Sequence, residues 1–538
     1  MAVARVRTAL QRAGAVVIAS LAVARLFAHW PRIWDIEFWD ESNYLAAGLW
    51  NWPGAMTRYE DFPLYSKFYH VLALALGSDD AARLYMLGGL LVILMGLAGV
   101  GLGVWAASKS VGASIASIAI VALTSALIWP RVVFLSLFVQ GVGFAASTRT
   151  SNRFAKLSVI ALTCYVATFV RSEFVIGFYV ATAAAIAASV HALISRRPER
   201  LRGYAAGLAA LATIAALSVL WSFPILRGNR RAMAAFGQHY GLRFVERHHL
   251  DINPWANPER IVSMDFPGAQ SVFGALRVNP AALTRFFAEN ALGIVPRSWR
   301  SILPIHFVPW GAGGLLLIAI ALWVACRPDA RRASRANEHG NVLCAAVLLL
   351  PPTLSVIVVF PRDHYVVQVM AAQMFVLAAL ARAAPESVAK SSERLPGWMT
   401  PRVRAWSPIV LAVCFLLWAR PLPVVGQPNW ARVRAIHELP AIERMLEADG
   451  GLCTYAMPRC ETVWGDTVPA NASFARYLDD NRIDAVAASP GLLRSISIRE
   501  NPSFQEFVST ATEHGWTRYE IPGEHPILVL VRSKNPAS

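Results

Sequence analysis

The sequence has few charged residues for its length. Only 16% of its 538 residues are Asp, Glu, Lys or Arg, whereas a soluble globular chain carries about a quarter. Cysteine is also scarce, and six cysteines are too few for a disulfide framework in a chain of this size. We find no internal repeat and no glycine-rich nucleotide-binding loop. These absences argue against an ordinary soluble protein and against a disulfide-stapled one.

Apolar residues take the place of the missing charge. The chain is 56% hydrophobic with a mean hydropathy of +0.44, and its apolar residues come in runs of about twenty, the length that crosses a bilayer core. The sequence therefore predicts a polytopic α-helical membrane protein with about eleven transmembrane helices. The predicted spans are 13–30, 81–106, 111–129, 132–147, 157–170, 174–194, 204–222, 303–325, 341–360, 364–383 and 406–424.

The net charge of +16 predicts cytoplasmic loops rather than a nucleic-acid partner, because membrane proteins gather Lys and Arg in cytoplasmic connections. Strongly basic connections alternate with short connections of mixed charge, which predicts a cytoplasmic N-terminus. Two long loops, 31–80 and 224–302, and the C-terminal part then lie outside. The basic connections are 148–156, 196–202, 327–335 and 390–404.

The composition changes near residue 426, where charge and turn residues rise. We divide the chain into a transmembrane domain, 1–425, and a small C-terminal α/β domain, 426–538, outside the membrane. Apolar runs of strand length occur at 484–489 and 527–532, with a helical pattern at 501–515. Cys453 and Cys460 in this domain are expected either to form a disulfide or to remain a pair of free thiols.

Two adjacent carboxylates, Asp40 and Glu41, follow the first apolar segment in IEFWDESNYLAAG, 36–48. A carboxylate at the edge of the hydrocarbon is costly and marks a candidate functional site. The alternative is a solvated loop in which one acid caps a helix. A second acid pair, Glu60 and Asp61, precedes a Pro-led aromatic segment, which favours a folded loop at the outer membrane surface.

These segments carry a family resemblance. FWDESNYLAAG (38–48), DFPLYSKFYHVLALALG (61–77) and DDAARLYML (79–87) resemble polyprenyl-phosphate-dependent glycosyltransferases of the GT-C fold. Within them, the chain is most similar to the bacterial branch related to protein mannosyltransferases and aminoarabinose transferases. That family often has Lys directly before the Pro of the second motif. Here the position is Phe62, and the nearest lysine is Lys67.

The resemblance implies a multi-pass enzyme of the bacterial inner membrane with its C-terminal domain in the periplasm. It implies transfer of a sugar from a polyprenyl-phosphate donor, held among the membrane lipids, to a lipid, glycan or protein acceptor. Asp40, with Glu41 beside it, would be the general base of an inverting reaction. By resemblance, Asp61 is the acid that would ligate a divalent cation, Mg²⁺ or Mn²⁺, if one is used.

A phosphate leaving group needs positive charge. The candidates near the outer ends of the predicted spans are Arg131, Arg171, Arg362, Lys67 and His364, and for each arginine the alternative is contact with lipid headgroups. We also expect the basic loop 224–302 to form a flexible lid over an anionic donor. A metal site at His248, His249 and Asp251 is a weaker alternative, because their spacing fits no zinc pattern.

Two other functions remain open at this stage. A lipid or solute transporter, or flippase, would place ionisable groups near the bilayer midplane, whereas here nearly all charges lie at span ends. A non-catalytic assembly or receptor protein would use its C-terminal tail as the active part. Replacing Asp40 by Asn separates both from a transferase.

Overall fold

A computed structural model of the chain was used. The structure describes residues 63–78, 81–122, 132–194, 201–221, 230–250, 258–302, 335–359, 363–383, 452–456, 459–463, 472–488, 492–493, 496–521 and 527–533, with Ser20, Tyr44, Gly48 and Val468. The predicted spans 303–325 and 406–424, and all of 13–30 except Ser20, lie outside the described residues.

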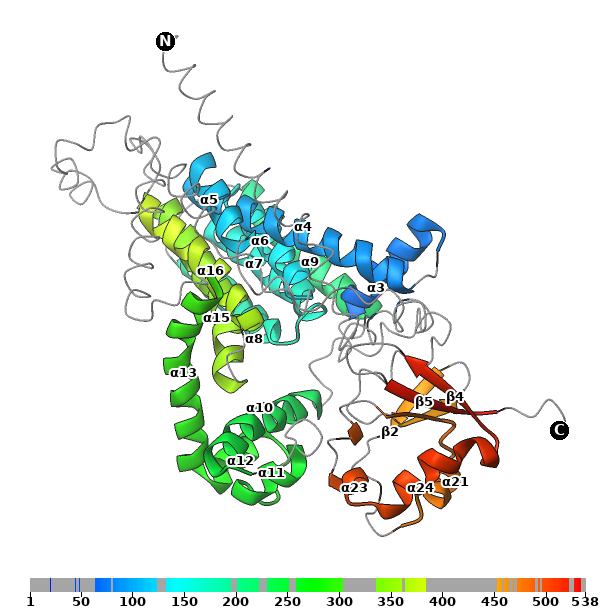
Figure 1. Cartoon of the computed structure of the whole chain (residues 1–538). Coiled ribbons are helices and arrows are strands. Elements are labelled where there is room, and N and C mark those ends of the chain that lie inside the picture. Colours follow the sequence, from blue (N-terminus) through cyan, green and yellow to red (C-terminus); the bar gives the residue numbers. More distant parts are fainter. Residues whose placement is uncertain are drawn as a thin grey trace, which may run out of the picture.

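Apolar helices pack side by side into a bundle (Figure 1). Helix α4 contacts α3, α5, α6 and α16; α7 contacts α6, α8, α9 and α15; and α15 pairs with α16. The bundle helices are α3 (Pro63–Leu76), α4 (Ala81–Ser108), α5 (Val111–Ala122), α6 (Val132–Ser147), α7 (Arg153–Thr168), α8 (Phe174–Ile194), α9 (Leu201–Trp221), α15 (Arg335–Val358) and α16 (Asp363–Ala383).

Four stretches in these helices are long and apolar enough to cross a membrane: Leu87–Ser108, Phe174–His191, Glu338–Val358 and Tyr365–Ala383. Shorter apolar stretches occur in α5, α6 and α9. This pattern indicates a membrane protein, as the sequence predicted. The total of about eleven spans and the GT-C fold remain predictions.

Glycines allow α4 to pack closely on its neighbours. A Cβ at Gly141 of α6 would lie 1.9 Å from the carbonyl oxygen of Gly99 of α4, and a Cβ at Gly103 would lie 2.4 Å from the Phe375 ring of α16. Small residues permit such backbone approach where apolar side chains gain little from leaving lipid. Helices α4 and α16 end at the same end of the bundle, because Lys109, directly after α4, interacts with Arg382 near the end of α16.

Four helices of the predicted outer loop form a separate helical unit: α10 (Arg230–His248), α11 (Pro258–Asp265), α12 (Val272–Val278) and α13 (Pro280–Ile302). Their aromatic core includes Phe236, Phe266 and Phe286. The long helix α13 connects this unit to α15 and α16, where the amide of Asn290 donates to the carbonyl of Ile357 at 2.9 Å. We expected a flexible lid, but the described part of the loop has its own packed core.

The C-terminal domain contains a five-stranded sheet in the order β2-β1-β3-β5-β4. Every described pairing is antiparallel, so the domain is α+β rather than the βαβ type. The predicted strands 484–489 and 527–532 are confirmed as β3 and β5. The elements are β1 (Leu452–Ala456), β2 (Arg459–Val463), α21 (Phe474–Asp480), β3 (Ala485–Ala488), α23 (Ile496–Arg499), α24 (Pro502–Thr510), a 3₁₀ turn (Ala511–His514), β4 (Trp516–Ile521) and β5 (Ile527–Arg532).

The central strands β3 and β5 have buried residues on both faces of the sheet. Val486 and Leu530 belong to the core that the sheet shares with Phe474 and Phe507 of its helices, which cover one face (Figure 1). Ala485 and Val529 point to the other face, because side chains alternate along a strand, and they belong to the same hydrophobic cluster as the bundle. The alternation therefore places the domain against the membrane part of the chain.

The strand register bears on the expected cysteine pair. Cys453 of β1 lies opposite Thr462, and Cys460 of β2 lies opposite Tyr455. The two cysteines are therefore diagonal neighbours, whose Cα atoms are typically about 7–8 Å apart. Disulfides need a shorter span, usually below about 6.8 Å. The side chains of both cysteines lie outside the described part, so the disulfide and the free thiols both remain predictions.

Candidate functional site

A buried ion pair lies where α7 turns into α8. The amide of Arg171 donates to the carbonyl of Ala167 at 2.7 Å, which keeps the connection tight. The guanidinium Nε donates to Oε1 of Glu173 at 2.7 Å, and Nη2 forms an ion pair with the same oxygen at 2.6 Å. The two side chains are only 7% and 13% exposed. Arg171 was a sequence candidate, and its partner is the acid two residues later.

An aromatic ring from a distant helix covers the guanidinium. The central carbon of Arg171 lies 4.9 Å from the ring centroid of Tyr365, near the start of α16. The Tyr365 ring in turn lies 6.0 Å from that of His239 on α10, which is buried. Stacking on a π face is a favourable place for a guanidinium. The outer helical unit and α16 therefore meet at Arg171.

The two acid-pair segments of the sequence pack together beside this ion pair. Tyr44, from the first segment, lies edge-on to Tyr65 of α3 with ring centroids 5.1 Å apart. His70 Nδ1 of α3 lies 3.1 Å from the carbonyl oxygen of Gly48. The amide of Leu64 donates to the carbonyl of Phe169 at 3.1 Å, two residues before Arg171. This hydrogen bond joins the first turn of α3 to the α7–α8 connection.

Electrostatics keep Arg171 charged although it is buried. Burial lowers the pKa of the guanidinium, and this is the largest single effect. The Glu173 carboxylate raises the pKa, with further contributions from the phenol groups of Tyr365 and Tyr44. Together these contributions exceed the effect of burial, so the pKa is raised. The site is a fixed positive charge, balanced by one acid and surrounded by aromatic rings.

The other sequence candidates are distributed differently. Lys67 lies on α3 and is half-buried. His364 is the second residue of α16, directly before Tyr365, and its side chain is not described. Five candidates lie outside the described residues: Asp40, Glu41, Asp61, Arg131 and Arg362. Sequence reasoning missed Tyr365 and His239 because no local signal connects α16 and α10 to the α7–α8 connection.

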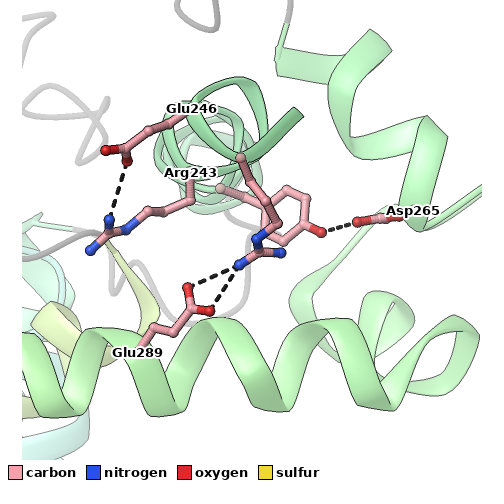
Figure 2. Close-up of polar contacts among 6 residues, drawn as sticks. Arg243, Glu246, Asp265 and Glu289 are labelled. Atoms are coloured by element: carbon pink, nitrogen blue, oxygen red, sulfur yellow. Dashed lines mark hydrogen bonds and ion pairs between the residues drawn. The ribbon is translucent and has the colours of Figure 1, made fainter. Parts of the chain in front are cut away.

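Two arginines of α10 in the outer helical unit face acids of the same unit (Figure 2). Arg243 pairs with Glu246 at 3.2 Å, and Arg247 reaches both oxygens of Glu289 on α13 at 2.9 and 3.0 Å. These contacts neutralise part of the positive charge that we expected to face a donor. The lid hypothesis is weaker for these two residues.

A short hydrogen bond runs from the Tyr240 hydroxyl of α10 to Asp265 at the end of α11. Burial and this carboxylate raise the pKa of Tyr240, so the phenol stays protonated.

Among the described residues, no group of three or more His, Cys, Asp or Glu side chains is arranged to hold a metal ion. His248 lies against the Phe244 ring, with centroids 4.3 Å apart, while Asp251 and Asp61 are outside the described part.

Comparisons of the chain with protein-family models, with curated protein sequences and with solved structures found no match.

Proposed function

We propose that the chain is a membrane glycosyltransferase that moves a sugar from a polyprenyl-phosphate donor to a hydroxyl acceptor. One observation carries the proposal. The two segments that resemble the GT-C enzymes, separated in sequence, pack against each other through Tyr44 and Tyr65 beside a buried, charged Arg171. A binding site for an anionic lipid donor needs such a charge next to acids that can act on the acceptor.

Asp40 is the proposed general base. It precedes Tyr44 by four residues, so chain length alone limits the distance between their Cα atoms to about 14 Å. In the reaction, the acceptor hydroxyl gives its proton to the Asp40 carboxylate, and the acceptor oxygen forms a bond to the anomeric carbon. The bond from that carbon to the phosphate oxygen breaks, and its electron pair leaves with the polyprenyl phosphate. Attack opposite the phosphate inverts the configuration.

Arg171 is proposed to stabilise the leaving phosphate. Arginine carries five N–H donors in a planar fork, and the contacts with Glu173 use Nε and Nη2, which leaves Nη1 for a phosphate oxygen. The Tyr365 ring fixes the plane of the guanidinium. In such a site the phosphate and Glu173 share one cation, so Arg362 and His364, close to Tyr365 in sequence, are proposed as further phosphate ligands. Arg131 and Lys67 are proposed as weaker contributors.

The proposed location and the proposed metal ligand both come from the family resemblance. The enzyme is placed in a bacterial inner membrane with the site on the outer side, and Asp61 is proposed to ligate Mg²⁺ or Mn²⁺ if a metal is used. Transport has less support. Among the described residues, the polar groups buried between the two ends of the bundle include Gln140 and Gln368, whose side-chain amides each donate to the Ser136 hydroxyl. None is ionisable, whereas coupled transporters place ionisable groups there.

The test is mass spectrometry of cell-envelope glycans from a deletion strain that carries either wild-type protein or an Asp40→Asn variant. We expect the wild-type chain to restore a glycosylated product that the variant does not restore, although the variant is inserted at the same level. Glu513→Gln, in the 3₁₀ turn of the C-terminal domain, is the matched control and should restore the product. A variant lacking the Asp40 carboxylate that restores the product fully contradicts the proposal.

A further inference from the structure

The opposite end of the bundle contains a fully buried lysine. Lys156 is the fourth residue of α7 and is 0% exposed. Its ammonium donates to the side-chain oxygen of Asn341 on α15 and to the carbonyl of Ser147 at the end of α6, at 3.4 Å. A buried ammonium without an acid beside it is costly. Its neighbours therefore decide whether this end is balanced in charge.

One carboxylate is shared at this end. Asn341 donates to Glu338 at 3.2 Å, and Arg382 near the end of α16 donates to the other oxygen of Glu338 at 2.7 Å. The Arg382 and Glu338 side chains are only 16% and 7% exposed. Glu338 thus balances Arg382 directly and Lys156 through Asn341. One negative charge serves two buried or half-buried cations.

Two exposed cations adjoin this group. Lys109 follows α4, which reaches the same end as α16, and Arg149 follows α6. The Lys109 ammonium lies 5.1 Å from the ring centroid of Trp105. Burial lowers the pKa of Lys109, the positive charges of Arg382 and Arg149 lower it further, and Glu338 raises it. Positive charges are therefore close enough here to repel one another.

The surface beside these cations is apolar. Trp105 is 41% exposed, and indole rings collect at the headgroup level of membranes. Leu343 of α15 and Leu380 of α16 are 44% and 47% exposed, so the outer surface of these two helices near this end is apolar, on other helix faces than the Glu338–Arg382 pair. An anion that bound here would meet cations on one side and a hydrocarbon-compatible surface on the other. A soluble phosphate ion would contact only the cations and not the apolar surface.

We propose that this end of the bundle binds the headgroup phosphate of an anionic phospholipid. Lys109 and Arg149 contact the phosphate, Trp105 lies at headgroup level, and the acyl chains run along the apolar outer surface of the bundle. At this end, the described residues that interact include four cations, Lys109, Arg149, Lys156 and Arg382, and one carboxylate, Glu338. The lipid phosphate adds the negative charge that would balance more of these cations. Basic pockets between transmembrane helices bind anionic headgroups in this way. The inference does not depend on the proposed glycosyltransferase activity.

The test is lipid titration of the purified full chain in detergent, followed by native mass spectrometry with phosphatidylglycerol or phosphatidylcholine. We expect the wild-type chain to retain phosphatidylglycerol preferentially. The double variant Lys109→Gln/Arg149→Gln should bind phosphatidylglycerol on the order of 30-fold more weakly, since each basic residue near an anionic headgroup contributes about fivefold. The charge-conserving variant Lys109→Arg/Arg149→Lys should keep the preference, which separates loss of charge from misfolding.

The matched control is Arg260→Gln/Arg277→Gln, which removes the same net charge from exposed positions of α11 and α12. This control should bind phosphatidylglycerol as the wild-type chain does. Inorganic phosphate at millimolar concentration should not displace the lipid. The proposal is overturned if the Lys109/Arg149 double variant keeps the wild-type preference, if the control loses it equally, or if free phosphate competes fully.

Discussion

The two ends of the helix bundle solve the same electrostatic problem in different ways. Helix α7 connects them, with Lys156 in its first turn and Arg171 just after its last, about 20 Å apart along the axis. At Arg171, one cation faces one acid, and aromatic rings fill the surroundings. At Lys156, several cations share Glu338. Counting only the residues that the structure describes, the first end pairs its cation with one acid, while the second has more cations than acids.

This difference agrees with the alternation read from the sequence. Arg149 and Lys156 come from the basic connection 148–156. The structure brings them to the same end as Lys109, between the predicted spans 81–106 and 111–129, and Arg382, at the end of the span 364–383. Arg171 lies at the other end, in a short connection of mixed charge. The positive-inside rule assigns the basic end to the cytoplasm. Sidedness in the membrane remains a prediction, and the difference in charge between the ends holds for the described residues.

The largest expected effect comes from breaking the balanced end. Arg171→Ala leaves the Glu173 carboxylate buried without its cation, and removing one partner of a buried pair typically costs about 3–5 kcal/mol. We expect a marked drop in the melting temperature of the purified chain, measured by intrinsic fluorescence. The double variant Arg171→Met/Glu173→Gln should recover much of the loss, because no uncompensated charge remains. An unchanged melting temperature in the single variant would show that the pair is not buried within the folded protein.

The second largest effect on stability is expected from removing the acid at the basic end of the bundle. Glu338→Gln removes the acid that Arg382 and, through Asn341, Lys156 rely on. A loss of about 2–4 kcal/mol is expected, since buried cations then lose their counter-charge. Anionic lipid should restore part of this stability, whereas it should not help Arg171→Ala. Melting curves with phosphatidylglycerol and phosphatidylcholine distinguish the two, and equal rescue of both variants would remove the contrast.

These two variants also mark what the sequence could predict. Arg171 was identifiable because it lies with Glu173 between two closely joined apolar spans. β3 and β5 were identifiable as short apolar runs bounded by polar residues. The rings that complete the site were not, because Tyr365 and Tyr44 reach Arg171 only through the packing of α16 and α3 against α7. Such non-local contacts leave no periodic pattern in the sequence.

Lys156 shows a different kind of miss. The sequence was interpreted as one solvated basic connection, 148–156, but α7 begins at Arg153, so Lys156 lies one turn inside the helix. It precedes Ile160 by four residues and Cys164 by eight, and both are buried. Residues with that spacing share a helix face. The periodicity was available in the sequence, and the charge of the side chain masked it.

A smaller effect is expected from removing this buried cation rather than its counter-charge. Lys156→Met replaces an ammonium by an apolar side chain of similar length, and such replacements of buried charges are often neutral or mildly stabilising. We expect stability to change by no more than about 1 kcal/mol, because the lost hydrogen bond to Asn341 is offset by reduced repulsion. The phosphatidylglycerol dependence of the melting temperature should decrease. A loss as large as that of Glu338→Gln would mean that Lys156 is needed for packing, not tolerated as excess charge.

The smallest effect supplies the exposed reference for both ends. Arg476 and Asp480 of α21 form an i,i+4 pair with a nitrogen–oxygen distance of 3.7 Å, and their side chains are 83% and 67% exposed. Water and salt screen such a pair, which contributes about 0.3–0.5 kcal/mol. Arg476→Ala should therefore leave the melting temperature within a degree or two, with any change disappearing in high salt. If Arg476→Ala lowered the melting temperature as much as Arg171→Ala does, burial of the charge would not explain the loss of stability in Arg171→Ala.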